Sequence, residues 1–164
     1  MPAFQKITPC MWFDTQAEEA TNFYVSIFED SRVVRVLYYG EAGQEIHGKL
    51  PGSIMLVEFE LAGQRFTALN GGPQFKFDEA ISLEVACDSQ SEIDYYWQKL
   101  TEGGEEGPCG WLKDKYGLSR QITPVALSEM LCDPDPEKIQ RVTNTFLQMK
   151  KLDLAELERA FAGE

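Results

Sequence analysis

Hydrophobic and polar residues alternate near the start of the chain, which is the pattern of a half-buried β-strand. The apolar positions of this strand candidate are Ile7, Pro9, Met11 and Phe13. The more polar positions between them are Thr8, Cys10 and Trp12. Successive side chains of a strand point to opposite faces, so we expect the apolar set to pack beneath the following helix and the mixed set to face the concave side of a sheet.

The same pattern returns further along the chain, because residues 14–18 (DTQAE) match residues 88–92 (DSQSE), 74 positions later. In both segments a hydroxyl residue precedes a glutamate by three positions, which predicts a capping box and a helix start: Thr15 with Glu18, and Ser89 with Glu92. The strand before the second helix again alternates, with Ile81, Leu83, Val85 and Cys87 against Ser82, Glu84 and Ala86. Duplication of one unit explains this match; chance is the alternative, since capped helices often follow strands.

Further strand candidates complete each unit. After the first helix they are residues 31–39, 54–61 and 64–70, the last two joined by a tight turn at Ala62-Gly63. Residues 40–52 form a polar loop that carries His47, a surface histidine by expectation. In the second unit a strand is expected within 105–112 and another over 118–124, so the predicted order is β-α-β-β-β, twice.

The C-terminal part predicts two helices. Asp135 is the predicted N-cap of the first, with Pro136 as its first helical residue. Asp153 and Glu156 form a further capping box, which predicts the start of the second. The first of these helices has an apolar stripe of Ile139, Val142, Phe146 and Met149. Such a stripe either packs on its own chain or contacts a partner subunit.

Charge and cysteine content narrow the environment. The chain of 164 residues has 27 acidic and 15 basic residues and a formal net charge of −12, so we expect no nucleic-acid and no membrane-surface partner. No apolar run is long enough to cross a bilayer, and residues 1–6 lack a signal-peptide pattern. Cys10, Cys87, Cys109 and Cys132 form no C-x-x-C pair, which argues against a zinc site or a disulfide scaffold. A cytoplasmic location with reduced thiols is therefore expected.

Four stretches of this sequence resemble the PhnB-like family, also catalogued as a 3-demethylubiquinone-9 3-methyltransferase domain. They are residues 7–14 (ITPCMWFD), 66–73 (FTALNGGP), 107–114 (GPCGWLKD) and 147–151 (LQMKK). The resemblance covers nearly the whole chain. It implies an α+β, vicinal-oxygen-chelate (glyoxalase and bleomycin-resistance-like) fold of paired βαβββ modules, and a homodimer.

On this basis the chain is interpreted as one domain over residues 1–164. Module one covers about residues 4–73, module two about 78–124, and C-terminal helices about 125–162.

The resemblance also places a ligand cleft on the concave strands. Metal-dependent relatives carry His, Glu or Gln there, whereas the matching positions here are Thr8 or Pro9, Ser82, Asn70 and Gln121. Hydroxyl and amide oxygens hold transition metals weakly, so no metal and no other cofactor is predicted, and a divalent ion is the less favoured alternative. The predicted ligand-binding residues are Thr8, Cys10, Trp12, Asn70, Ser119 and Gln121.

Three side chains have two interpretations each. Glu84 lies in the mixed set of its strand, where it could act as a general base or simply be a solvent-facing or paired glutamate. Cys109 is either a nucleophile favoured by Lys113 or an ordinary packed thiol. Arg120 stands where we expect relatives to have Trp, so it changes either the packing or the charge of the cleft.

Three functions follow in order of preference. The first is metal-independent binding of a small molecule, as in the bleomycin-resistance relatives. The second is an isomerase, lyase or dioxygenase that uses a metal or a base such as Glu84. The third is the methyltransferase that the family label suggests, although no glycine-rich G-x-G turn follows a strand here.

Overall fold

The computed structural model describes residues 5–164. The chain divides into two compact units, one that ends at Lys76 and one that runs from Phe77 to Glu164. Each unit contains a four-stranded sheet with a helix on one face, so the α+β class and the repeated strand and helix order are confirmed.

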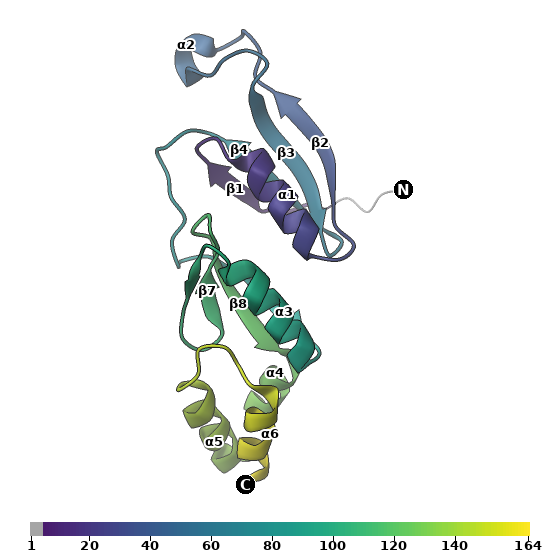
Figure 1. The fold of residues 1–164 in the computed structure, drawn as a ribbon, viewed down its shortest axis with the longest axis vertical. Coiled ribbons are helices and arrows are strands. Elements are labelled where there is room, and N and C mark those ends of the chain that lie inside the picture. The colour runs from purple at the N-terminus through teal and green to yellow at the C-terminus, as the bar shows by residue number, and fades with distance from the viewer. Residues whose placement is uncertain (1–4) are drawn as a thin grey trace. The chain divides into compact units, whose positions relative to one another are not determined.

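The first unit follows the order strand, helix and three strands, with one short helix in a loop (Figure 1). Its elements are β1 (Cys10–Phe13), α1 (Ala17–Ile27), β2 (Arg32–Tyr38), α2 (Gln44–His47), β3 (Ile54–Leu61) and β4 (Gln64–Asn70). The sheet order is β1-β4-β3-β2, with β1 parallel to β4 and the other pairs antiparallel. The short helix α2 lies in the loop that the sequence predicted as irregular.

Alternation along β1 sorts its side chains as the sequence predicts. Met11 and Phe13 are buried, whereas Cys10, the first residue of the strand, is exposed and Trp12 is half-buried. The buried apolar residues from the other elements of this core are Ala17, Ala20, Tyr24, Ile27, Val57, Phe59, Leu61, Phe66 and Ala68. Ile7 was expected in the same strand but lies before it and is 83% exposed.

The second unit repeats the topology and adds three helices (Figure 1). Its sheet elements are β5 (Ser82–Cys87), α3 (Gln90–Thr101), β6 (Glu105–Glu106), β7 (Trp111–Lys113) and β8 (Ser119–Pro124). Their order is β5-β8-β7-β6, with β5 parallel to β8. The predicted single strand at 105–112 is two short strands, because Cys109 and Gly110 adopt left-handed backbone conformations (φ 56° and 82°) that interrupt it.

The capping boxes predicted for the two repeated helices have different outcomes. Ser89 is the N-cap of α3, its hydroxyl accepts a hydrogen bond from the N–H of Glu92, and the Glu92 carboxylate accepts one from the N–H of Asp88. The box at Thr15 is wrong: α1 begins after Gln16, which makes no side-chain cap. The N–H of Ala17 instead donates to the side chain of Asn70, from the far end of β4.

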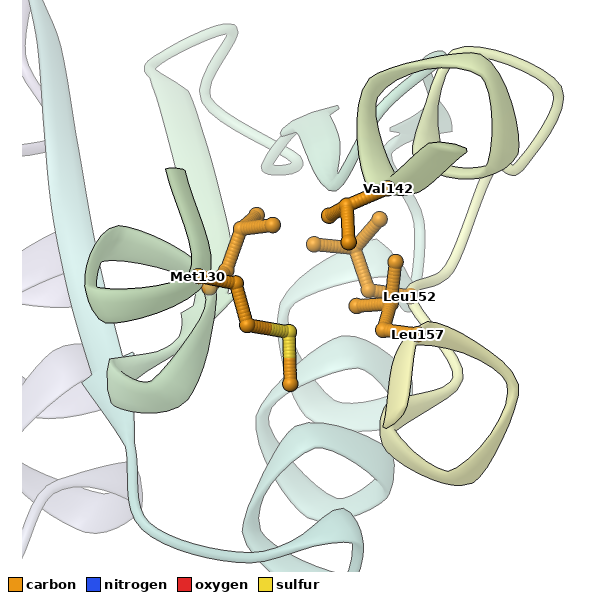
Figure 2. Close-up of a cluster of buried hydrophobic side chains, with 5 residues drawn as sticks. Met130, Val142, Leu152 and Leu157 are labelled. Carbon is orange, nitrogen blue, oxygen red and sulfur yellow. The ribbon is translucent and has the colours of Figure 1, made fainter. Parts of the chain in front are cut away.

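The C-terminal helices are α4 (Val125–Leu131), α5 (Pro136–Phe146) and α6 (Leu154–Ala162). The caps predicted for α5 and α6 are present, with Asp135 and Asp153 accepting backbone N–H groups. The helix α4 was not predicted. Leu127, Met130, Val142, Leu152 and Leu157 form one buried cluster, and Figure 2 shows these side chains converging from the three helices and the α5–α6 connection.

The apolar stripe of α5 packs inside the second unit. Val142 is fully buried in the cluster, and Phe146 and Met149 pack against it. Among residues 5–164, none of the helices has the length and hydropathy that a membrane crossing requires.

Candidate functional site

In each unit, one face of the sheet packs against a helix, α1 in the first unit and α3 in the second, and within residues 5–164 no helix of the same unit covers the other face. Strand register identifies this helix-free face in the second unit: Ser119 lies between Ser82 and Lys113, and Gln121 lies between Glu84 and Trp111. Two predicted ligand-binding residues, Ser119 and Gln121, thus lie two positions apart on one strand and on the same face.

A cavity of about 450 Å³ lies on this part of the second unit. That volume is within the range of small-molecule sites. Its uncharged lining residues are Gly107, Pro108, Trp111, Leu112 and Ser119. Its charged side chains come from Glu79, Glu105, Glu106 and Lys113.

Ser119 is the polar residue buried most deeply in this cavity wall, with no exposed surface. Its hydroxyl oxygen has no hydrogen-bond partner among the described residues. A buried hydroxyl left unpaired costs about 1–3 kcal/mol. Because Ser119 has no surface open to solvent, a neighbouring side chain must move before a polar group of a ligand can hydrogen-bond to this hydroxyl and remove that cost.

The charged residues give the cavity an acidic exposed side. Lys113 forms an ion pair with Glu79 at 2.5 Å, and both side chains are partly exposed. The hydrogen bond from Lys113 holds the pKa of Glu79 below its usual value, and the same bond raises the pKa of Lys113. Both groups therefore stay charged near neutral pH. Glu105 and Glu106 are also exposed, and Glu106 forms an ion pair with Lys150 at 3.6 Å. Three carboxylates and two ammonium groups leave a negative surplus, which disfavours anionic ligands.

The other open-face residues of the second unit are already paired. Gln121 donates from its side-chain nitrogen to the hydroxyl of Ser82 at 2.9 Å. Glu84 is exposed and accepts a hydrogen bond of 2.6 Å from the hydroxyl of Thr123. Neither Gln121 nor Glu84 is among the residues that line the 450 Å³ cavity.

Trp12, predicted to bind a ligand, contacts other parts of the first unit. Its indole N–H donates to the carbonyl of Gly72 at 2.8 Å, and its ring meets that of Phe75 edge-on at 4.9 Å. Gly71 lies directly against the indole, so close that an added Cβ would be 2.2 Å from it. The indole therefore holds the segment that follows β4.

Asn70 also has a structural role in the first unit. It is 7% exposed, its side-chain oxygen accepts from Ala17, and its side-chain nitrogen donates to the carbonyl of Ile54 at 3.1 Å. The hydroxyl of Tyr39 donates to its backbone carbonyl. Both polar atoms of the amide thus have partners inside the protein.

The remaining predicted residues of the first unit lie on its open face. Cys10 is exposed and lies opposite Thr67 in the sheet. Thr8 and Thr67 line a smaller cavity of about 210 Å³ together with Arg35, Glu58 and Arg65. Arg35 is paired with Glu58 at 2.6 Å, so that cavity has little free charge.

Arg120 affects packing and not the cavity. Its side chain is 1% exposed, and its register partners Leu83 and Leu112 place it on the helix-covered face. Its Nε donates to the carboxylate of Asp114 at 3.2 Å. The same carboxylate accepts the N–H of Leu118, which shapes the turn between β7 and β8.

The cavity contains residues that the sequence analysis did not assign to a site. Trp111 and Lys113 are two of them, and a correct assignment of strand β7 would have placed both on one face of the sheet. Glu79 reaches the cavity from the segment before β5, and no pattern in the sequence marks it. Cys109 is half-buried, and its N–H donates to the carbonyl of Met149.

The residues at the metal-ligand positions of the fold do not fit a metal site. Ser82 and Gln121 bond to each other, and Asn70 is committed to α1 and β3. Within residues 5–164 no group of three or more His, Cys, Asp or Glu side chains is placed to hold a metal ion.

Comparison with known proteins agrees with this fold. The family model for 3-demethylubiquinone-9 3-methyltransferase matches residues 5–123. A solved Bacillus cereus protein described as a PhnB protein is 36% identical, with a TM-score of 0.64, and the match covers 74% of this chain and all of that one. A search of curated proteins found no match.

Two more distant structures support the fold alone. A Pseudomonas aeruginosa protein is 17% identical with a TM-score of 0.60, over 74% of this chain and 98% of that one. The fosfomycin resistance protein from Listeria monocytogenes is 13% identical with a TM-score of 0.51, over 77% of this chain and 97% of that one. Together with the family match, these similarities show that the chain belongs to the 3-demethylubiquinone-9 3-methyltransferase, or PhnB-like, family and has the vicinal-oxygen-chelate fold.

Proposed function

We propose that this protein binds a small neutral or cationic organic molecule in the 450 Å³ cavity of the second unit, without a metal. The observation that carries the proposal is the buried, unpaired hydroxyl of Ser119 in the wall of a cavity that also contains Trp111 and Leu112. An apolar or aromatic group would contact Trp111, and one polar group would hydrogen-bond to Ser119. The surplus of carboxylates disfavours anions.

Binding of aromatic probes that differ only in charge tests this proposal. Protein labelled with 5-fluorotryptophan gives separate ¹⁹F NMR signals for its three tryptophans, of which only Trp111 lines the cavity. We expect 2-naphthol and 2-naphthylmethylamine to shift the Trp111 signal in a saturable way, and 2-naphthoate to bind at least fivefold more weakly. Shifts confined to Trp12, or none for any probe, would contradict the proposal.

Two serine variants separate a specific hydrogen bond from apolar contact. Ser119→Ala removes the hydroxyl and should weaken the binding of 2-naphthol about five- to tenfold, the value of one hydrogen bond. Ser128→Ala on α4, where the side chain is exposed, is the matched control and should leave binding unchanged. Equal affinity in both variants would show that Ser119 does not contact the probe.

Catalysis by a base and methyl transfer are the alternatives. Glu84 is the open-face carboxylate of β5, and a base-assisted isomerase or lyase would lose its activity in Glu84→Gln. A methyltransferase would bind S-adenosylmethionine, yet neither strand-to-helix turn contains a glycine, and both carry an aspartate, Asp14 and Asp88. We therefore expect no heat signal when S-adenosylmethionine is titrated into the protein.

The proposal includes a homodimer in the cytoplasm. The open face of the first sheet has the apolar side chains of Trp12, Leu37, Leu56 and Leu69 in register, which a second copy would cover. The four free thiols fit a reducing compartment. Sedimentation equilibrium should give about twice the chain mass of 18.6 kDa, and a monomer mass would refute the dimer.

A further inference from the structure

The loop between β6 and β7 forms one wall of the cavity and has a strained backbone. Gly107, Pro108 and Trp111 from this loop and its end line the cavity. Cys109, in the middle, has a positive φ of 56°, which costs a residue with a side chain about 1–2 kcal/mol. A loop of this shape keeps a single conformation only when surrounding contacts hold it there.

Those contacts come from the connection between α5 and α6. The N–H of Cys109 donates to the carbonyl of Met149, and the N–H of Gly110 donates to the carbonyl of Lys150, both at 2.7 Å. Leu152, fully buried, lies over Gly110, where an added Cβ would be 3.2 Å from its side chain and 2.8 Å from the carbonyl of Ile122. Two amides of the loop therefore hydrogen-bond to this segment, and the absence of a side chain at Gly110 leaves the space that Leu152 occupies.

Gln90 fixes the same segment from the other side. This first residue of α3 uses both ends of its amide: the nitrogen donates to the carbonyl of Leu152 at 3.2 Å, and the oxygen accepts from the N–H of Leu154 at 2.8 Å. The ion pair of Lys151 with Asp94, also on α3, adds an exposed contact of small value. Residues 149–154 are thus held between the cavity loop and the start of α3.

The helices around this segment form a core of their own. Figure 2 shows Leu152 packed with Met130, Val142 and Leu157. The family model ends at residue 123, before all three C-terminal helices begin. The strands and helices of the two repeated units therefore do not by themselves include the part that holds the loop.

We propose that residues 125–164 act as a brace that fixes the loop 107–110 through the backbone of Met149 and Lys150, and that Gln90 is the positioning residue which aligns this brace. The brace keeps the cavity wall in one conformation, so the C-terminal helices set the cavity's shape without lining it. The effect of the brace on ligand binding rests on the proposed function. The brace itself is defined by the hydrogen bonds that the amides of Cys109 and Gly110 donate to Met149 and Lys150.

Hydrogen exchange measured by NMR on the full chain tests the brace directly. Gln90→Ala should raise the exchange rates of the Cys109 and Gly110 amides at least tenfold, because their acceptors lose their anchor. The amide of Ala20, in the first unit, should be unchanged. Gln98→Ala, an exposed change on the same helix, is the matched control and should affect none of them.

Two results would overturn the proposal. One is an unchanged exchange rate at Cys109 and Gly110 in Gln90→Ala while the Leu154 amide exchanges faster. The other is obtained on the unmodified protein and decides the matter if the variant does not fold: the brace requires that Cys109 and Gly110 open with the same urea dependence as Leu157 in α6. Opening at much lower urea would show that the loop is not held by the helices.

The ligand experiment keeps this proposal distinct from the proposed function. If 2-naphthol binds, its affinity should fall about threefold or more in Gln90→Ala and stay constant in Gln98→Ala. If it binds equally well in both while exchange at Cys109 and Gly110 accelerates, the brace stands and its influence on the cavity is refuted. If no probe binds the parent protein, the proposed function fails, and the exchange data still decide the brace.

Discussion

The side-chain oxygen of Asn70 accepts a hydrogen bond of 2.8 Å from the backbone N–H of Ala17, at the start of a helix 53 residues earlier in the chain. The last residue of β4 thereby caps α1, and its amide nitrogen also holds the start of β3 through Ile54. One buried side chain thus joins three elements of the first unit.

We expect Asn70→Ala to lower the free energy of unfolding by about 2–3 kcal/mol, because one buried and one partly buried backbone group lose their partners. Asn70→Asp keeps the acceptor for Ala17 but places a second carboxylate oxygen against the carbonyl of Ile54, so it should also lower the stability. Urea denaturation measures both values. Gln64→Ala, exposed on the same strand, is the control, and a loss of similar size in that variant would contradict the capping role.

Cys87 gives the second unit a predictable response to alkaline pH. Burial first, and then the charges of Glu92 and Asp88, raise the pKa of its thiol to about 12. The unfolded chain releases this proton near pH 8.5, so above that pH the folded state binds more protons than the unfolded state, and stability falls as pH rises towards 12. The slope from this one group approaches about 1.4 kcal/mol per pH unit.

Urea unfolding between pH 7 and pH 10.5 measures that slope. Cys87→Ala should have a flatter profile than the parent protein, whatever its stability at pH 7, whereas Cys132→Ala, which removes an exposed thiol, should keep the parent profile. Parallel profiles for the parent and Cys87→Ala would show that the thiol ionises normally in the folded state.

The buried pair of Arg120 and Asp114 should be costly to break from one side. Asp114→Asn leaves the guanidinium in a site with 1% exposure and should lower stability by about 3–5 kcal/mol. The double variant Asp114→Asn with Arg120→Leu also removes the positive charge, so it should recover part of the lost stability. The control is Glu58→Gln, which breaks an exposed pair with Arg35 and should cost about 1 kcal/mol or less. Equal losses in the single and double variants would contradict a charge effect.

The close approach of Gly71 to Trp12 predicts a local effect in the first unit. Gly71→Ala places a Cβ 2.2 Å from the indole ring, so the ring must move and its hydrogen bond to Gly72 is lost. We expect a loss of about 1–3 kcal/mol and a changed indole N–H signal of Trp12 in NMR spectra. Gly40→Ala, where no atom lies within 4 Å, is the control. An unshifted Trp12 signal in Gly71→Ala would refute this contact.

Patterns within one element were sufficient to predict most of the fold. The alternation of Met11 and Phe13 with polar neighbours and the caps at Ser89, Asp135 and Asp153 depend on residues a few positions apart, and each is confirmed. The errors come from interactions between distant segments. Thr15 was predicted as the cap because it lies next to the helix in the sequence. The group that bonds the start of α1 instead belongs to Asn70, at the end of β4.

The candidate site was harder to predict for the same reason. Of the predicted ligand-binding residues, Ser119 lines the 450 Å³ cavity, because its place on β8 follows from alternation. Trp12 and Asn70 have suitable chemistry for a ligand, but their polar groups bond to backbone that the sequence does not place beside them. Glu79 enters the cavity through an irregular segment, where no periodic pattern exists to indicate a direction.

The two-residue strand β6 has a consequence for how the protein behaves at high concentration. It forms one edge of the second sheet, and it consists only of Glu105 and Glu106, both exposed. Another chain that attempted to extend the sheet there would place its own backbone against two adjacent carboxylates, and a second copy would bring the same negative charges. This edge therefore resists polymerisation into fibres.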